Sequence, residues 1–400
     1  MTDSNKTAAV IVAGVRTPIG TAFKGTLRDT TAMELAQIVV AEALRRSTLA
    51  PAQVDDIILA ESNYGGGDIA RYAAVTAGMP QVPGQAVNRH CAGSLTAIGT
   101  AAAQIVAGAE RVIIAGGVNS QSTSPMQQFR TPGTIDEFTE QWMPPTHPDS
   151  PEAPNMDMSI TVGWNTAKKV GITREEMDAW AFRSHQRAVA AIDSGVFDDE
   201  IVPVKALQAD GSQVDFTVDE HPRRATSLEK LAGLKVLHPE IEGFSITAGT
   251  ASGINDAAAA VVVVDSELAR EQGLEALATV TAWASTAIDP ANTGLAVLDV
   301  IPKVLKRGGI SISDVALWEI NEAFASVPLA ACKTLGIDDE IVNTAGSGCS
   351  LGHPVAASGA RMIVTLVHEL RRRGGGYGVA AMCAGGGQAG AVLINVGAPA

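Results

Sequence analysis

The chain has 400 residues, of which 46% are hydrophobic and only 4% are aromatic, and it contains 40 glycines. This length predicts more than one domain, and the composition is typical of an Ala-, Gly- and Val-rich α/β protein. The formal net charge of −14 argues against nucleic acid or an anionic membrane as a partner of the whole surface. An anionic ligand would need a local basic patch.

The four cysteines, at positions 91, 332, 349 and 383, are scattered and form no CxxC pair. This spacing argues against a zinc site, so we expect no metal, and against a disulfide framework. Residues 1–6 lack the apolar core of a signal peptide, no apolar run is long enough to span a membrane, and residues 397–400 do not form a peroxisomal signal. We therefore expect a cytoplasmic protein without a membrane span.

In chain order, the hydrophobic pattern predicts a buried strand over 8–14, an amphipathic helix over 31–46 and a second strand over 54–60. A helix over 97–107 and a strand over 111–117 follow. Strands that alternate with helices predict a mostly parallel sheet.

Cys91 lies where an extended stretch gives way to an Ala-rich helix. Unpaired backbone N–H groups and the helix dipole favour the thiolate at a helix N-terminus, and the thiolate is the nucleophilic form. This position indicates a nucleophile, and the alternative is a buried structural cysteine. The segment by itself does not decide between them.

Residues 120–246 differ in composition from the flanking chain, with clusters of Pro, Met, Gln and charged residues. Helical segments are predicted within this stretch at 173–194 and 227–234. We interpret the stretch as a large insertion over the core, and long insertions in α/β proteins are usually functional.

From residue 248 the core pattern resumes, and a second α/β unit begins at Leu277. Residues 43–49 align without a gap on 304–310, and the same offset places Val54 on Val315. The shared order of elements favours an internal duplication over a chance likeness of two helix–strand units.

Three segments of the second half carry reactive side chains. Asn321 follows a strand and precedes a helix, where its amide is suited to hold a water or an oxyanion, although an N-cap is the alternative. His353 is fixed in a Gly-rich loop before a helix and is a candidate general base. Cys383 ends a buried strand and precedes three glycines, a position suited to proton transfer, with a core cysteine as the alternative.

Together these segments resemble the thiolase family over essentially the whole chain. The resemblance rests on the combination of Cys91, Asn321-Glu322-Ala323-Phe324, Gly352-His353-Pro354 and Cys383-Ala384-Gly385-Gly386-Gly387. It implies a duplicated α/β fold, a five-layer αβαβα sandwich with an inserted loop domain. On this basis we expect an N-terminal domain over 1–272, with the loop domain at about 120–246, and a C-terminal domain over 273–400.

The resemblance also implies the mechanism. Cys91 stands in the position of the nucleophile that carries the acyl group in a ping-pong scheme, and His353 resembles its base. Cys383 resembles the second acid/base. The oxyanion groups implied are His353 with a water on Asn321 at one site, and the N–H groups of Cys91 and Gly385 at the other.

Coenzyme A and acyl-CoA are the substrates that the resemblance implies, with no tightly bound cofactor. Arg223, beside Arg224, is the candidate for the nucleotide end of CoA, and Ser252 matches a family position that contacts the pantetheine. A homodimer or homotetramer is expected, and a partner subunit is possible.

Several positions depart from the family pattern. Gly93 replaces a usual Ser or Thr, Ser347 a glycine, and Cys349 an aliphatic residue. The segment 155–161 contains no histidine where acetoacetyl-CoA thiolases carry His-Met-Gly against the short acyl group. This difference argues against a strict preference for acetoacetyl-CoA and leaves room for longer or branched chains.

The expected activity is thus CoA-dependent acyl transfer, by acetyl-CoA acetyltransferase or longer-chain 3-ketoacyl-CoA thiolase chemistry. A decarboxylating ketoacyl synthase would not use a second catalytic cysteine, so Cys383 argues against that class. The remaining alternative is a thiolase-like scaffold subunit that binds acyl-CoA or lipid with little activity of its own.

Overall fold

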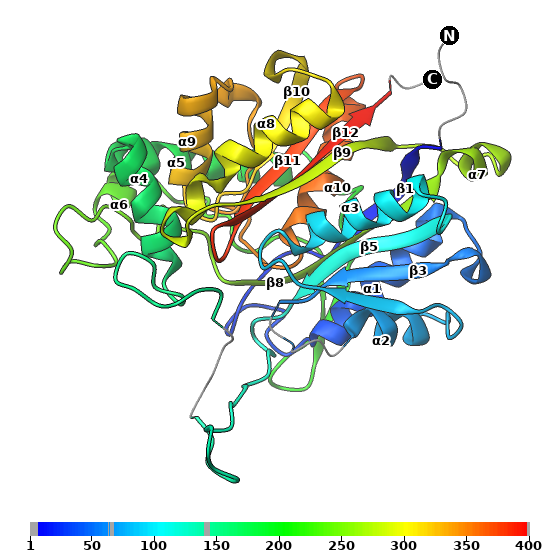
Figure 1. Ribbon diagram of the computed structural model, residues 1–400, viewed down its shortest axis with the longest axis horizontal. Helices are drawn as coiled ribbons and strands as arrows, with labels where there is room; N and C mark the ends of the chain where they lie inside the picture. Colours follow the sequence, from blue (N-terminus) through cyan, green and yellow to red (C-terminus); the bar gives the residue numbers. More distant parts are fainter. Residues whose placement is uncertain (1–6, 63, 65–67, 140–144, 398–400) are drawn as a thin grey trace.

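The computed structural model describes residues 7–62, 64, 68–139 and 145–397. Its elements fall into two similar halves (Figure 1). The strands of the first half are β1 (Ala9–Arg16), β2 (Gly20–Thr21), β3 (Asp56–Ala60), β4 (Gly84–Val87), β5 (Val112–Asn119) and β8 (Asn255–Asp265). Its helices are α1 (Ala32–Ser47), α2 (Ile69–Thr76), α3 (Gly93–Val106) and α7 (Ser266–Glu271).

The second half repeats this order with fewer strands. Its strands are β9 (Ala278–Ala287), β10 (Val315–Ile320), β11 (Gly376–Ala384) and β12 (Gln388–Val396). Its helices are α8 (Val297–Gly308), α9 (Ser326–Leu335) and α10 (Ser358–Arg372).

The strand pairing shows that the two halves are built alike. In the first half β1 and β8 are antiparallel, β8 and β5 are antiparallel, and β5 and β3 are parallel. In the second half β9, β12, β11 and β10 follow one another with the same three orientations. The short 3-10 turns Pro51–Gln53 and Ile312–Asp314 also stand at corresponding places before β3 and β10. The predicted duplication is confirmed.

The five layers can be traced from the helices that pack against each face of the strands. In β1, Val10 belongs to a core shared with α1 and α2, whereas its neighbour Ile11 belongs to a core shared with α3 and α10. Period-two alternation of side chains explains this division. The strands of the second half likewise cover α3 and α10 on one face and α8 and α9 on the other. The α3 and α10 pair is therefore the central layer of the predicted αβαβα sandwich.

The two layers of strands touch at one place. Val10 pairs with Thr279 and Ile11 with Ala278, so β1 and β9 join the halves. The described strands of the two halves accordingly form one sheet in the order β10-β11-β12-β9-β1-β8-β5-β3-β4, and β2 pairs with β8 outside this order.

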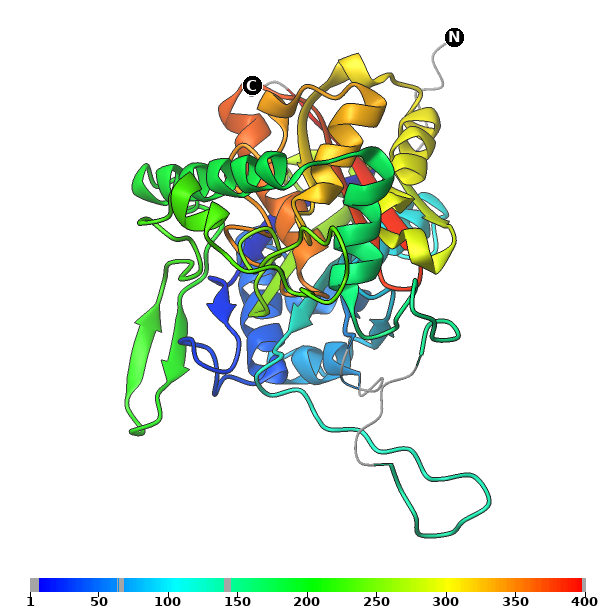
Figure 2. The same ribbon diagram turned by 90° about the vertical axis from the view of Figure 1, so that its left-hand side faces the viewer.

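The predicted insertion lies between β5 and β8. Its elements are a π-helical turn (Ser159–Trp164), α4 (Asn165–Val170), α5 (Arg174–Asp193), α6 (Leu228–Ala232) and the hairpin β6 (Val204–Leu207) and β7 (Gln213–Phe216). Figure 2 shows α5 crossing the second half while the hairpin stands apart. Both predicted helical segments are confirmed by α5 and α6, whereas the domain limits at 272 and 273 stay a prediction.

Among the helices of residues 7–62, 64, 68–139 and 145–397, none combines the length and the apolar character needed to cross a bilayer.

Candidate active site

Cys91 lies in the short loop between β4 and α3, where its side chain is partly buried. The loop turns sharply because His90 adopts a left-handed conformation (φ 45°), supported by the bond from its N–H to Asn88 Oδ1 at 2.9 Å. Gly93 then begins α3, and a Cβ at this position would lie 2.7 Å from Cβ of Ala60 on β3. Close packing of α3 on β3 thus explains the glycine at a position where Ser or Thr is usual.

The electrostatic environment of Cys91 differs from the sequence-based expectation. Burial raises the pKa of the Cys91 thiol to about 11, although the main-chain N–H groups of Gly385 and of Cys91 itself act in the opposite direction. The N–H groups thus favour the thiolate, as predicted, but desolvation outweighs them. At neutral pH the sulfur is a thiol and needs a base to take its proton.

His353 is the residue predicted to be this base. The residue is 6% exposed, and burial together with the positive charge of Arg361 lowers the pKa of His353 to about 4. The imidazole is therefore neutral at pH 7. Its Nδ1 lies 2.6 Å from Ser358 Oγ, and that hydroxyl donates its own hydrogen to the Pro354 carbonyl at 3.0 Å. Since the hydroxyl has one hydrogen, we assign the histidine proton to Nδ1, which leaves Nε2 as an acceptor.

The backbone of His353 is held from the first half of the chain. Its N–H donates to Oδ1 of the fully buried Asn255 at 3.0 Å. Asn255 Nδ2 in turn donates to the Gly20 carbonyl at 3.0 Å. Gly352 has φ 103°, and a Cβ there would lie 2.4 Å from the Asn255 side chain. The Gly-rich loop therefore lets β8 approach and fix the histidine.

Asn321 faces His353 across the site. Its Nδ2 lies 3.4 Å from each ring nitrogen of His353, and its N–H donates to the Ala381 carbonyl on β11 at 3.0 Å. Its side chain is buried, yet within the described residues Oδ1 has no hydrogen-bond partner. A buried polar atom normally has one, so a water or a substrate oxygen fits here. The alternative of an N-cap does not hold, because α9 begins five residues later with Ala325 as its N-cap.

Cys383 lies near the end of β11 and is buried as a free thiol. Burial raises the pKa of this thiol, and the charge that Cys91 carries as a thiolate raises it further. The effect of the Cys91 charge shows that the two sulfurs lie close enough to interact electrostatically. Beyond Ala384 the chain turns through Gly386 and Gly387, both at φ 77°. The structure therefore brings the four predicted groups, and the N–H of Gly385, to one site.

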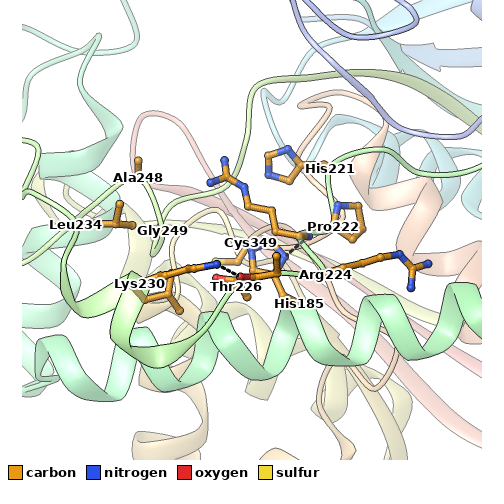
Figure 3. Close-up of a pocket in the computed structure, with 13 residues that line it drawn as sticks. His185, His221, Pro222, Arg224, Thr226, Lys230, Leu234, Ala248, Gly249 and Cys349 are labelled. Atoms are coloured by element: carbon orange, nitrogen blue, oxygen red, sulfur yellow. Dashed lines mark hydrogen bonds between the residues drawn. The ribbon is translucent and has the colours of Figure 1, made fainter.

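A basic pocket of about 560 Å³ lies beside α5 (Figure 3). Arg223 lines it, and the N–H of Arg223 donates to Nδ1 of His185 on α5 at 3.2 Å. Arg224 also lines it but is bonded to Asp193 at 2.6 and 2.8 Å. Further lining residues are His221, Pro222, Ala225, Thr226, Lys230, Leu231, Leu234, Ala248, Gly249 and Cys349.

Ser252 does not line this pocket. Its N–H donates to the Ala323 carbonyl at 2.9 Å, which places it next to the segment that begins with Asn321.

Three contributors to the site were missed by sequence reasoning. They are Ser358 against His353, Asn255 behind its backbone, and the pocket histidines. Ser358 carries a local signal, since it stands five residues after His353 at the start of a helix. Asn255 carries none, because it lies 98 residues away in the chain.

Comparison with known proteins agrees with this arrangement. The family model of the N-terminal thiolase domain matches residues 9–267, and that of the C-terminal thiolase domain matches residues 274–396. The chain belongs to the thiolase family. Thiolases cleave a 3-ketoacyl-CoA with CoA, or condense acetyl-CoA with an acyl-CoA in reverse, so this thiolase is an acyltransferase.

Individual relatives cover almost the entire chain. A β-ketoadipyl-CoA thiolase of Acinetobacter baylyi is 40% identical, over 97% of this thiolase and 99% of its own length. An acetyl-CoA acetyltransferase of Syntrophomonas wolfei is 38% identical, over 96% and 98%. The crystal structure of human mitochondrial 3-ketoacyl-CoA thiolase in complex with CoA is 33% identical, covers 98% of both chains and has a TM-score of 0.88. These likenesses confirm the predicted fold class.

Proposed function

We propose that this thiolase transfers acyl groups through a thioester on Cys91. The observation that carries the proposal is the convergence of Cys91, His353, Asn321 and Cys383 from four separate segments. Nε2 of His353 takes the proton of the Cys91 thiol, which the pKa of about 11 requires. The sulfur then attacks the ketone carbon of a 3-ketoacyl-CoA, and the N–H groups of Cys91 and Gly385 stabilise the oxyanion.

Carbon–carbon cleavage follows from that tetrahedral intermediate. The C2–C3 bond breaks and leaves the acyl group on Cys91 and the enolate of acetyl-CoA. A water on Asn321 and His353 stabilise the enolate oxygen, and Cys383 donates its proton to C2. The Cys383 thiolate then recovers a proton from the thiol of an incoming CoA, whose sulfur attacks the Cys91 thioester and forms the shortened acyl-CoA. The Cys91 thiolate that leaves takes back the proton held by His353.

We propose the basic pocket beside α5 as the site of the CoA nucleotide. Arg223 supports this, because no ion pair involves its guanidinium within the described residues, whereas Arg224 is paired with Asp193. Lys230 adds a second cation. Ser252 would meet the pantetheine between this pocket and Cys91.

The acyl preference that we propose includes chains longer than acetoacetyl. The segment 155–161 has no histidine of its own, but His238 from a distant part of the chain contacts it. The two ring nitrogens of His238 bind Asp157 at 2.8 Å and Glu240 at 2.7 Å. Those carboxylates raise the pKa of His238. Its ring is therefore engaged and does not replace the missing acyl contact, while Met158 packs against the core of the second half.

The assembly and location stay proposals. β4 is the last strand in the sheet order, and within the described strands it pairs only with β3, which supports a homo-oligomer built through a second copy. We place the protein in the cytoplasm on the sequence features alone.

The deciding experiment is CoA-dependent loss of the enolate absorbance of acetoacetyl-CoA and of longer 3-ketoacyl-CoAs. We expect turnover with both and no strict preference for acetoacetyl-CoA. No turnover with any member of the series would favour the scaffold alternative.

A further inference from the structure

Glu322 is a fully buried carboxylate that the proposed reaction does not use. Its two oxygens accept four hydrogen bonds. Oε1 accepts from Trp180 Nε1 at 2.8 Å and from Asn343 Nδ2 at 2.9 Å. Oε2 accepts from Ser184 Oγ at 2.6 Å and from the N–H of Cys349 at 3.1 Å. All four donors are neutral.

A buried charge is costly unless its hydrogen-bonding capacity is used, and this one is satisfied without a cation. The donors come from three separate segments. Two stand on α5 of the insertion, one follows the 3-10 turn Asp339–Ile341, and one lies in the loop that leads to His353. The carboxylate therefore joins the insertion to the catalytic half of the fold.

The same segments set the position of the catalytic pair. Asn321 precedes Glu322 directly, and Cys349 lies four residues before His353. Between them, the loop approaches the main chain so closely that a Cβ on Gly348 would lie 2.4 Å from the Glu322 carbonyl oxygen. A shift of the Glu322 side chain therefore changes both sides of the contact between Asn321 and His353.

Asn343 holds the strand end at the same time. Its Oδ1 accepts from the N–H of Ile320 at 2.9 Å, and its Nδ2 donates to the Ile320 carbonyl at 2.8 Å as well as to Glu322. Its left-handed conformation (φ 52°) turns the side chain back onto β10. The end of β10, from which Asn321 projects, is thus fixed by the same cluster.

We propose that Glu322 is a positioning residue of the thiolase reaction, which holds Asn321 and His353 at their working separation by anchoring both segments on α5. The inference rests on the proposed roles of those two side chains. Because His185 on α5 also lines the basic pocket, the helix that fixes the catalytic pair is the helix that borders the CoA site.

The test is a double-mutant cycle on kcat with acetoacetyl-CoA and CoA, using Glu322→Gln, Asn321→Ala and the double variant. In Glu322→Gln, the glutamine NH2 group would face two hydrogen-bond donors at either oxygen position, so the side chain must move. We expect kcat to fall about 10²-fold, which is the effect of a displacement near 1 Å. If Glu322 acts through Asn321, the double variant will be little slower than Asn321→Ala alone. KM for CoA should change little.

Glu200→Gln is the matched control. Glu200 is equally buried and accepts from Arg16 Nε at 2.9 Å and Thr365 Oγ1 at 3.0 Å. We expect it to lower the melting temperature and leave kcat unchanged. Should Glu322→Gln fail to fold, Ser184→Ala removes a single donor and should lower kcat in the same direction. Wild-type kcat in Glu322→Gln or Ser184→Ala, or additive losses in the cycle, would overturn the inference, whereas an inactive wild type would overturn the proposed function instead.

Discussion

Ser358 Oγ lies 2.6 Å from Nδ1 of His353 and determines which ring nitrogen carries the proton. The hydroxyl donates its hydrogen to the Pro354 carbonyl and therefore accepts a hydrogen bond from the imidazole. This arrangement leaves Nε2 as an acceptor, and we propose that this atom takes the proton of Cys91. We therefore expect Ser358→Ala to slow acyl transfer by about 5- to 30-fold, the equivalent of about 1–2 kcal/mol for a lost hydrogen bond.

The comparison of Ser358→Ala with Ser358→Thr separates the hydroxyl from the packing of the side chain. Threonine keeps the oxygen, so it should retain more activity than alanine. Equal rates for the two variants would show that the contact does not orient His353.

Because the pKa of His353 is low, we predict that kcat/KM changes little with pH on the acidic side of its pH profile. Burial and Arg361 hold that pKa at about 4, so the imidazole remains neutral, and able to accept a proton, as the pH falls from 8 to about 5. Protonation removes the base, and activity should fall only as the pH approaches 4. We expect kcat/KM for thiolysis, measured per folded enzyme, to stay constant between pH 7 and 5.5. A half-maximal loss near pH 6.5, the value of an unperturbed histidine, would contradict the buried neutral base.

The close approach of α3 to β3 makes Gly93 sensitive to substitution. A Cβ at this position would lie 2.7 Å from Ala60 Cβ, so Gly93→Ser must move the helix that begins after Cys91. We expect a loss of about 1–3 kcal/mol in the free energy of unfolding, the usual cost of overpacking, together with slower acylation. Gly108→Ala is a useful comparison, since a Cβ there would meet no atom within 4 Å, although its φ of 72° adds strain. Unchanged stability and activity in Gly93→Ser would show that α3 has room to move.

Much of this site was predictable from the sequence because its reactive residues stand at strand ends and helix starts. Cys91, Asn321, His353 and Cys383 all follow that rule, and the resemblance to the thiolase family implied the layers in which these elements lie. The pKa of Cys91 was not predictable, because desolvation depends on how neighbouring segments cover the sulfur. The environment of Glu322 was not predictable either, since Trp180 and Ser184 lie 142 and 138 residues away in the chain.

Arg223 and Arg224 are adjacent, exposed and differently engaged, so they form a matched pair for the CoA site. If Arg223 binds a phosphate of CoA, Arg223→Ala should raise KM for CoA about 10-fold or more, as expected for about 1.5–3 kcal/mol from a charged hydrogen bond. Arg224→Ala loses an exposed ion pair with Asp193 and should change KM by at most about fivefold. Equal effects of the two substitutions on KM would contradict the assignment of Arg223.

The central claim is that Cys91 carries the acyl group, and mass spectrometry after treatment with acetyl-CoA tests it most directly. We expect the wild-type protein to gain one acetyl group, on the peptide that contains Cys91. Cys383→Ala and Cys349→Ala should still be acetylated, because neither thiol forms the thioester, whereas Cys91→Ala should gain no mass. Acetylation of Cys91→Ala at another cysteine, or a wild-type protein that never becomes acetylated, would contradict the account.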